Sequence, residues 1–391
     1  MAYENAKVAL DKGGDREKAL YRMGMAAYGM KEWQKAANHF VEILKEFPEH
    51  AFASEQLKRA TARSCEERSG KFNFKMMHLE SIKAAPEIDV SDYSGPIEIA
   101  DIPGKGRGII ASKDIQKGTL LAVSKAFSSS HSKDFPGKLI SINVIRNAEE
   151  TAAQMLVIVR AMENILKNPQ RAKEVYNLYS GHSTENEQVP DATAHKNIYG
   201  DVMVIHASTN IKKGDEIFLA YIHPLNPARE KCLSCWKFTC ECCLCQAEEK
   251  DENCSKRTQI FNEFIRLSVN KNTPQNVITK REALLKRMRE TYTNENKFKL
   301  HLAKMLTDLS SDYFDMGNTK KCIKCLEEVI SLMEDPLEYV LDDVRVNLAI
   351  CYYTNGQTSK AKEMIQKAFE LSLCVDKDHF KLIYPDGAKL L

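Results

Sequence analysis

The chain has 391 residues, of which 43% are hydrophobic and 28% are charged. This composition is typical of a soluble globular protein with about two to four domains. Lys and Arg total 56 against 54 for Asp and Glu, a net charge of +2, which argues against a protein that coats nucleic acid. No apolar run approaches the roughly 20 residues of a membrane-spanning helix, and the polar first residues are unlike a signal peptide. We therefore expect an intracellular protein, nuclear and/or cytoplasmic, with no direct contact to nucleic acid or membrane.

The first part of the chain is predicted to be helical. Between residues 19 and 48, apolar and small residues recur at steps of three and four, the spacing of one helix face. The segment also resembles the 34-residue tetratricopeptide template, with matches at Leu20, Gly24, Ala36, Phe40 and Pro48. Small residues allow the two helices to approach closely, and Pro48 ends the second one. A further helix is expected at residues 52–67, within an N-terminal helical segment of residues 1–90.

The character of the sequence changes near Asp92. PIEIADI, GIIAS and GTLLAVSKAF are short β-type runs bounded by turn residues, as expected for strands. A helical insert is predicted at 148–179. Strand patterns return in ATAHKNIYGDVMVIHAS, which we interpret as a hairpin turning at residues 199–201, and EIFLAYI is predicted to be a last strand.

After about Asp251 the chain is again predicted to be helical. Two more segments fit the tetratricopeptide template, with matches at Leu309, Ser310, Tyr313 and Gly317, and at Leu348, Ala349, Tyr352, Gly356, Ala361 and Ala368. Taking the two glycines as equivalent gives an offset of 356 − 317 = 39 residues, so a longer linker than the standard one is expected. The alternative is a set of generic antiparallel helices with aromatic cores. Such repeats form concave surfaces, so protein partners are expected there.

A glycine-rich string, IPGKGRGIIASKDIQKGTLL, follows the first predicted strand. Its glycines at 104, 106 and 108 allow another molecule to approach the backbone closely. It is not a dinucleotide-binding fingerprint, because no helix with an acidic residue about 20 positions later follows it. Taken alone, it is equally well a glycine-rich β-turn.

The whole string resembles the opening of SET domains, the catalytic domains of protein-lysine methyltransferases. The residues that carry this resemblance are Lys105, Gly106, Arg107, Gly108, Ala111, Ile115, Gly118 and Leu121. In that family the backbone of the turn binds S-adenosylmethionine. The resemblance therefore makes Lys105, Gly106, Arg107 and Gly108 the candidate cofactor-binding residues.

A second string, residues 200–224, resembles the closing half of SET domains. Its matches are Ala207, Ile211, Gly214, Asp215, Glu216 and Ile217. Tyr221 falls where the family has its catalytic tyrosine, so the resemblance makes it the candidate catalytic residue. Without that context, a tyrosine after an apolar strand is usually a residue at the edge of the core. The nearby His195, His206 and His223 are interpreted as surface or strand-edge residues.

Seven of the twelve cysteines lie within one short stretch, at positions 232, 235, 240, 242, 243, 245 and 254. Closely spaced thiols in an intracellular protein favour tetrahedral zinc over disulfides; the alternative is a reduced, metal-free cluster. The string AREKCLSCWKFTCECCLC resembles the post-SET module of the SET-and-MYND branch, which implies zinc ligands at Cys240, Cys242 and Cys245. A MYND finger is not recognised in this sequence.

One SET signature is missing. The family carries Asn-His-Ser-Cys just before the hairpin, where it contacts the cofactor and supplies the fourth zinc ligand. Here residues 185–193 read ENEQVPDAT. Either the core has diverged to an inactive form, or a segment is missing at the junction of Pro190 and Asp191. The fourth zinc ligand would then have to come from Cys243, Cys254, Cys232 or Cys235.

We therefore expect an α+β protein with four parts: N-terminal repeats (1–90), a SET domain with a helical insert (92–225), a post-SET zinc module (226–254) and C-terminal repeats (255–391). The implied function is S-adenosylmethionine-dependent methylation of lysine in a protein substrate. The alternative is a non-catalytic repeat scaffold with a degenerate or truncated SET core.

Overall fold

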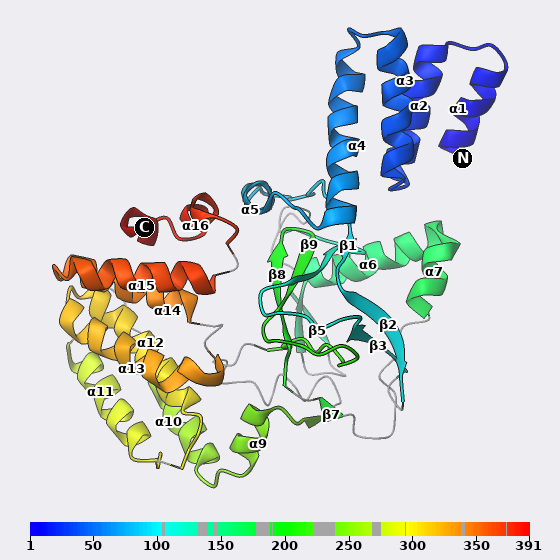
Figure 1. The fold of residues 1–391 in the computed structure, drawn as a ribbon. Coiled ribbons are helices and arrows are strands. Elements are labelled where there is room, and N and C mark those ends of the chain that lie inside the picture. Colours follow the sequence, from blue (N-terminus) through cyan, green and yellow to red (C-terminus); the bar gives the residue numbers. More distant parts are fainter. Residues whose placement is uncertain are drawn as a thin grey trace.

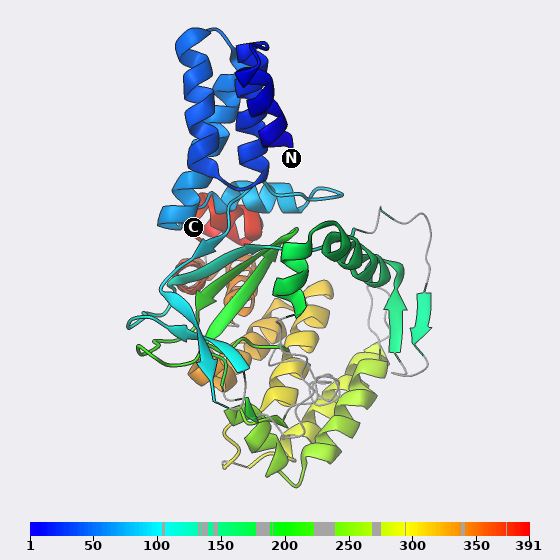
Figure 2. The same ribbon diagram turned by 90° about the vertical axis from the view of Figure 1, so that its right-hand side faces the viewer.

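The computed structural model describes residues 1–103, 106–131, 134, 140–143, 148–176, 188–189, 191–222, 239–267, 275–293, 295–337, 341–372 and 374–391. A β-rich middle part lies between two groups of helices, one from each end of the chain (Figure 1). The turned view shows the same arrangement from the side (Figure 2). The expected α+β class with helical repeats at both ends is thus confirmed. None of the helices within the described residues is long and apolar enough to cross a bilayer.

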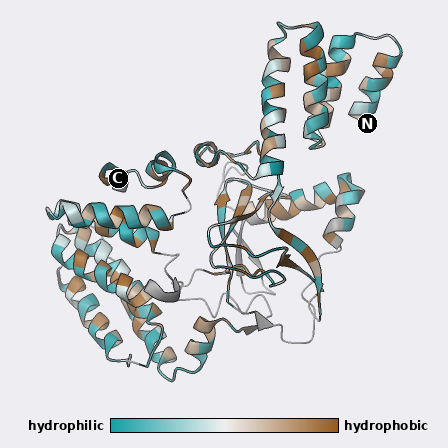
Figure 3. Ribbon diagram, viewed as in Figure 1, coloured by the Kyte–Doolittle hydropathy of each residue, from teal (hydrophilic) through white to brown (hydrophobic). Residues whose placement is uncertain are grey.

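The first four of the N-terminal helices form an antiparallel group, and the fifth packs against a C-terminal helix and the sheet instead. Their bounds are α1 Ala2–Asp11, α2 Arg16–Gly29, α3 Trp33–Glu46, α4 Ala51–Ser69 and α5 Phe74–Ser81. Hydrophobic and hydrophilic residues alternate along these helices (Figure 3), as expected where one face is buried. A Cβ atom on Gly24 would lie 2.6 Å from the fully buried ring of Phe40. The two template positions therefore depend on each other, because only glycine lets α2 and α3 approach this closely.

The middle of the chain contains a four-stranded antiparallel sheet with the order β1-β4-β9-β8 and three two-stranded sheets, β10-β7, β2-β3 and β5-β6, among the described residues. The strands are β1 Tyr93–Ser94, β2 Ile97–Ile102, β3 Gly106–Ala111, β4 Leu120–Lys125, β5 Ile140–Asn143, β6 Ala148–Thr151, β7 Gln188–Val189, β8 Ala194–Tyr199, β9 Val202–Ala207 and β10 Thr239–Cys240. The predicted hairpin is confirmed, since Tyr199 pairs with Val202 across Gly200, which has φ +52°.

Two predictions for this region were wrong in part. The insert predicted as helical from residue 148 begins with strand β6, and its helices are α6 Ala152–Lys167 and α7 Pro169–Tyr176. The predicted strand EIFLAYI is not continuous: residues 216 and 219 form isolated bridges to two different partners. Ile217 donates its N–H to Ile109, whereas the Phe218 carbonyl accepts the N–H groups of Thr193 and Ala194. A segment shared between two partners in this way cannot extend either ladder.

Two equivalent segments cross between the halves of the β-rich part. Ile115 and Ile211 exchange both backbone hydrogen bonds, at 2.8 and 2.9 Å. The N–H of Gly118 reaches the carbonyl of Ala207, and the N–H of Gly214 reaches that of Ala111, each at 2.8 Å. Both glycines have a positive φ, +85° and +87°, which favours glycine. The same motif, Ala-x-x-x-Ile-x-x-Gly, occurs at residues 111–118 and 207–214. It occurs twice because each copy pairs with the other.

Side chains reinforce this crossing with the same symmetry. The Asn210 side-chain oxygen accepts the N–H of Lys117, and the Asp114 carboxylate accepts the N–H of Lys213, both at 2.9 Å. Apolar residues from both halves fill the space behind, namely Ala111, Ile115, Leu121, Ala194, Ile205, Ala207 and Ile211.

The C-terminal helices repeat one geometry. They are α9 Cys243–Glu249, α10 Cys254–Arg266, α11 Gln275–Arg289, α12 Leu300–Asp315, α13 Thr319–Leu337, α14 Asp342–Thr354, α15 Thr358–Leu371 and α16 Lys377–Ile383, with the short 3-10 helix Gly387–Leu390 at the end. Gly317 and Gly356 both follow a helix with positive φ, +72° and +77°. The hydroxyls of Tyr313 and Tyr352 donate to Glu282 and Glu327, which lie on the preceding helices α11 and α13. The equivalence predicted from the 39-residue offset is therefore confirmed.

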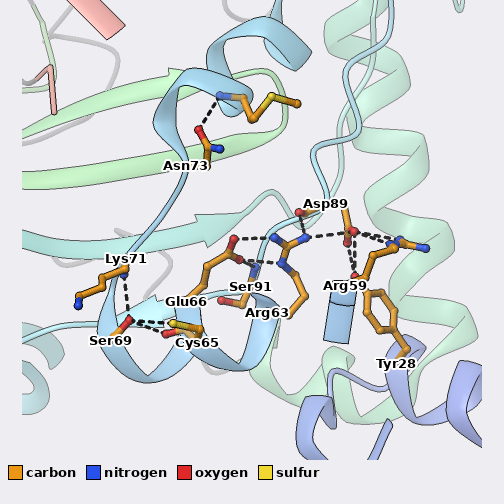
Figure 4. A network of polar contacts seen from close by, with 11 residues as sticks. Tyr28, Arg59, Arg63, Cys65, Glu66, Ser69, Lys71, Asn73, Asp89 and Ser91 are labelled. Atoms are coloured by element: carbon orange, nitrogen blue, oxygen red, sulfur yellow. Dashed lines mark hydrogen bonds and ion pairs between the residues drawn. The ribbon is translucent and has the colours of Figure 1, made fainter. Parts of the chain in front are cut away.

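A polar network joins the N-terminal helices to the start of the β-rich part (Figure 4). The Asp89 carboxylate accepts the Tyr28 hydroxyl at 2.7 and 2.8 Å and the Arg59 guanidinium at 2.9 and 3.0 Å. Arg63 also pairs with Asp89, at 3.1 Å, and forms a two-point ion pair with the buried Glu66. Burial raises the pKa of Asp89, but the hydrogen bonds from Tyr28 and Arg59 outweigh it and hold this pKa below its usual value. The network therefore attaches the connecting segment to α2 and α4.

Histidines gather where the four-stranded sheet meets α5 and α16. His195 and His206 are cross-strand neighbours on β8 and β9, and Phe74 contacts the rings of His206 and His379. His206 is 8% exposed, and its Nδ1 has no hydrogen-bond partner among the residues that the structure describes. Burial, with a smaller contribution from His195, lowers the pKa of His206 to about 4. The ring is therefore neutral in the folded protein at neutral pH.

The Asp89 network predicts a stability effect. We expect Asp89→Ala to lower the free energy of unfolding by about 1–2 kcal/mol, because two arginines and a tyrosine lose a charged acceptor. Chemical denaturation measures this change. The control variant Glu163→Ala removes an exposed i,i+4 ion pair with Lys167. This variant should change the free energy of unfolding by less than about 0.5 kcal/mol. Equal effects for the two variants would contradict the role given to Asp89.

His206 predicts a pH dependence of stability. Its pKa falls from an unfolded value of 6.5 to about 4, so between these pH values the unfolded state binds the extra proton. Above pH 6.5 the ring is neutral in both states and the free energy of unfolding is not reduced. As the pH falls toward 4, protonation of the unfolded state lowers the free energy of unfolding by up to about 3 kcal/mol. We expect His206→Gln to flatten the curve of unfolding free energy against pH in this window. Parallel curves for the two proteins would show that His206 does not titrate this way.

Candidate functional site

The glycine turn lies at the start of β3. Gly106 has φ +76°, a left-handed conformation that glycine adopts without strain. A Cβ atom on Gly108 would lie 2.7 Å from Ile102 and 2.9 Å from the carboxylate of Glu216. Gly108 is therefore required by the packing of β2 and of the closing SET-like segment against β3. Gly104 and Lys105 lie outside the described residues.

Strand β3 has two edges, and the closing segment uses the outer one. Residues 97–102 of β2 pair along one edge. On the other edge, Ile109 and Ala111 bond Ile217, Asp215 and Gly214. Arg107 lies two residues before Ile109 and therefore belongs to the same edge of the strand.

Tyr221 follows the same closing segment. Ile110 and Glu216 form an antiparallel bridge, so moving back along β3 toward Gly106 corresponds to moving forward toward Tyr221. The parallel bridge between Ala194 and Leu219 places the approach to Tyr221 beside the start of β8. The Tyr221 side chain is 47% exposed. The closing segment thus runs from the outer edge of β3 to the start of β8 before it reaches Tyr221.

The histidines near these motifs have structural surroundings. His195 bonds the Asn197 side chain at 3.1 Å, and His206 packs against Phe74. His223 lies outside the described residues. The interpretation of His195 as a strand residue agrees with its place on β8, whereas His206 is in the core rather than at a surface.

Three cysteines come together where β10 meets α9. The Sγ atoms of Cys240, Cys242 and Cys245 lie within 4.8 Å of one another. Zn–S bonds of about 2.3 Å in tetrahedral geometry place thiolates about 3.8 Å apart, so the three thiols fit one zinc ion. Each is half-buried, as expected at the edge of a small module. The sequence prediction of a shared site for these cysteines agrees with this geometry.

Two of the proposed fourth ligands lie outside this group. Among the described residues, neither Cys243 nor Cys254 joins the three thiols. Burial, with a hydrogen bond to Asp191, raises the pKa of Cys243 to about 12. Cys232 and Cys235 lie outside the described residues.

The junction that lacks Asn-His-Ser-Cys lies beside the cysteine cluster. Strand β7 pairs in parallel with β10, with Val189 opposite Cys240. The Asp191 carboxylate accepts the N–H of Cys243 at 2.9 Å. The sequence reasoning did not foresee this pairing, because two-residue strands carry no detectable periodicity. Val189 and Asp191, on either side of Pro190, therefore both contact the segment that carries the cysteine cluster.

The comparisons with known proteins agree with these observations. The SET domain model matches residues 106–222, and two tetratricopeptide models match residues 18–50 and 342–373. A curated relative from Gibberella zeae, called "Methyltransferase", is 22% identical over 391 aligned positions, which cover 81% of this chain and 53% of the relative. The chain thus spans about half the length of that relative.

The matched SET domain includes the glycine turn from Gly106, both crossing segments and Tyr221. The repeat matches fall on α2–α3 and on α14–α15. This chain contains a SET domain between tetratricopeptide repeats.

Proposed function

We propose that the chain is an S-adenosylmethionine-dependent methyltransferase that acts on lysine side chains of proteins. The observation that carries this proposal is the pairing of the two SET motifs at the Ile110–Glu216 bridge, which puts the segment that leads to Tyr221 against the strand that begins at the glycine turn. The relative called a methyltransferase supports the same class of reaction. We also propose the four-part division at residues 1–90, 92–225, 226–254 and 255–391.

In this proposal, Lys105, Gly106, Arg107 and Gly108 hold the cofactor, chiefly through their backbone. The left-handed conformation of Gly106, φ +76°, supports this, because a turn without side chains lets a ligand approach the backbone closely. S-adenosylmethionine supplies the methyl group when bound. The chain's own task is to hold the lysine amine neutral and aligned, and alignment contributes much of the acceleration in such a displacement.

Tyr221 would be the positioning group for the amine. A tyrosine hydroxyl both donates and accepts a hydrogen bond, so it can orient an amine lone pair toward the methyl group. Desolvation of the lysine lowers its pKa and favours the neutral, nucleophilic form. Tyr221 is not required to act as a general base in this arrangement.

We further propose that Cys240, Cys242 and Cys245 bind zinc as a structural ion. Their mutual distances support it, and a structural zinc site couples metal binding to folding. The ion would hold β10 and the start of α9 together beside the junction at Pro190–Asp191. We propose Cys232 or Cys235 as the fourth ligand, because Cys243 and Cys254 lie outside the group.

A non-catalytic interaction scaffold is the second candidate function, and helix α6 favours it. Arg160 and Asn164 of α6 bond the backbone of Ser129 and Phe127 at 2.6 and 2.8 Å, so this helix contacts the domain through a polar face. The exposed apolar side chains follow helical spacing: Met155, Ile158, Val159, Met162 and Leu166, which are 45–80% exposed. Contiguous apolar surface of this kind marks interaction sites.

Titration of the zinc-loaded protein with S-adenosylmethionine separates the two functions. A methyltransferase should bind at micromolar affinity, about −8 kcal/mol, and should label a lysine-containing peptide library.

Tyr221→Phe should retain this affinity while turnover falls by at least about tenfold, because only the aligning hydroxyl is lost. Tyr353→Phe, an exposed tyrosine on α14, is the control and should leave both unchanged. Absence of cofactor binding in a folded sample would favour the scaffold, and equal turnover in Tyr221→Phe would remove Tyr221 from the reaction.

The zinc proposal has its own measurement. We expect Cys240→Ser to lower bound zinc, measured by mass spectrometry of the metal content, together with the melting temperature, because hydroxyl is a poor substitute for thiolate. Cys65→Ser alters an exposed cysteine on α4 and should change neither. Full zinc occupancy in Cys240→Ser would overturn the ligand set.

A further inference from the structure

Two cysteines meet between consecutive helices of the C-terminal repeats. Cys322 lies in the first turn of α13 and Cys351 near the end of α14. Their Sγ atoms are 3.1 Å apart, and the residues are 2% and 1% exposed. Both are free thiols in this structure.

The pair needs little movement to become covalently linked. A disulfide has an S–S bond of about 2.05 Å, so each sulfur would move by about half an ångström. The helices that carry the two cysteines already pack against each other. We propose that Cys322 and Cys351 form a reversible disulfide, which makes this pair an oxidation site that links α13 to α14. This inference is independent of the proposed methyltransferase function.

The two thiols are unequal. The hydrogen bond with Cys322 lowers the pKa of Cys351, whereas the same bond, together with burial, raises the pKa of Cys322. Either sulfur can donate the hydrogen bond that joins them. Because the thiolate is the nucleophile, the reaction is written with Cys351, the thiol of lowered pKa, as the sulfur that reacts first, and the linked product is the same in either order.

A hydroperoxide is the co-reactant by class. The Cys351 sulfur attacks the terminal peroxide oxygen, the O–O bond breaks, and Cys351 becomes a sulfenic acid while alcohol or water leaves. The Cys322 sulfur then attacks the Cys351 sulfur, the S–O bond breaks, and the Cys322 proton leaves with the hydroxyl as water. Two thiols are oxidised by two electrons, and one hydroperoxide is reduced.

A third cysteine provides an internal contrast. Cys325 lies one turn after Cys322 on α13 and is 7% exposed. Burial raises the pKa of Cys325 to about 11. The described sulfurs include a hydrogen-bonded partner for Cys322 but none for Cys325. Proximity, rather than burial or helix position, thus selects the Cys322–Cys351 pair.

The bond would stabilise the packing between repeats. The Tyr352 hydroxyl donates to Glu327 at 2.6 Å across the same two helices, next to the cysteines in sequence. A covalent link there would hold α14 in its present register against α13. The concave surface of the C-terminal repeats would then be less able to change shape when the protein is oxidised.

The test uses the full-length protein treated with hydrogen peroxide, unfolded in acid, alkylated and digested with trypsin. Trypsin separates the three cysteines, because Cys322 falls in peptide 322–324, Cys325 in 325–345 and Cys351 in 346–360. We expect peptide 322–324 linked to 346–360, its loss after dithiothreitol, and a reversible rise in melting temperature of about 5 °C.

Variants and an internal standard make the result decisive. Cys325→Ala should still form the linked peptide, whereas Cys351→Ala should lose both the link and the temperature shift. The exposed Cys65 reports that the peroxide dose was sufficient. Recovery of 322–324 and 346–360 as alkylated thiols, at a dose that oxidises Cys65, would overturn the proposal. A link from Cys325 in place of Cys322 would overturn it as well.

Discussion

The reciprocal pairing of residues 111–119 with residues 207–215 is the constraint on which the middle of the molecule depends. Each segment supplies the backbone partners of the other, so neither half of the SET domain has a complete hydrogen-bond set alone. Their side-chain contacts, Asp114 to Lys213 and Asn210 to Lys117, repeat the exchange. An alteration in one segment therefore removes partners from the other, and unpaired buried backbone groups are costly. The crossing also fixes the register of β3 against residues 215–217.

The two motifs of this crossing could be recognised in the sequence because the requirements within each motif are local. Gly118 and Gly214 need a positive φ, and each stands three residues after a buried isoleucine. The same holds for Gly24, which is small because Phe40 occupies the adjoining space, and for the glycines that follow α12 and α14. In each case one residue type at a fixed spacing satisfies a steric condition that a template can record.

What the sequence did not reveal depends on long-range contacts. The attachment of Asp89 to Tyr28 spans 61 positions, and no periodicity indicates it. The pairing of β7 with β10 is two residues long. The break in the segment 216–222 arises because β3 and residues 193–194 compete for the same stretch. For the site, the grouping of Cys240, Cys242 and Cys245 was expected from the motif, whereas the role of Tyr221 and a fourth ligand for the proposed zinc ion remain predictions.

The place of that missing ligand connects the two departures from the SET pattern. Val189 lies opposite Cys240, and Asp191 holds the N–H of Cys243, so the chain reaches the cysteine cluster on both sides of the junction. A conventional Asn-His-Ser-Cys motif at this point would supply both a thiolate to the cluster and an asparagine to the cofactor side. In the proposed function, its absence would affect the zinc site and the cofactor site together, through one stretch of chain. The crossing segments, in contrast, bond to each other. A SET-like framework can thus be retained while its chemistry is altered, because the contacts that hold the framework and the residues that complete the site lie in different segments.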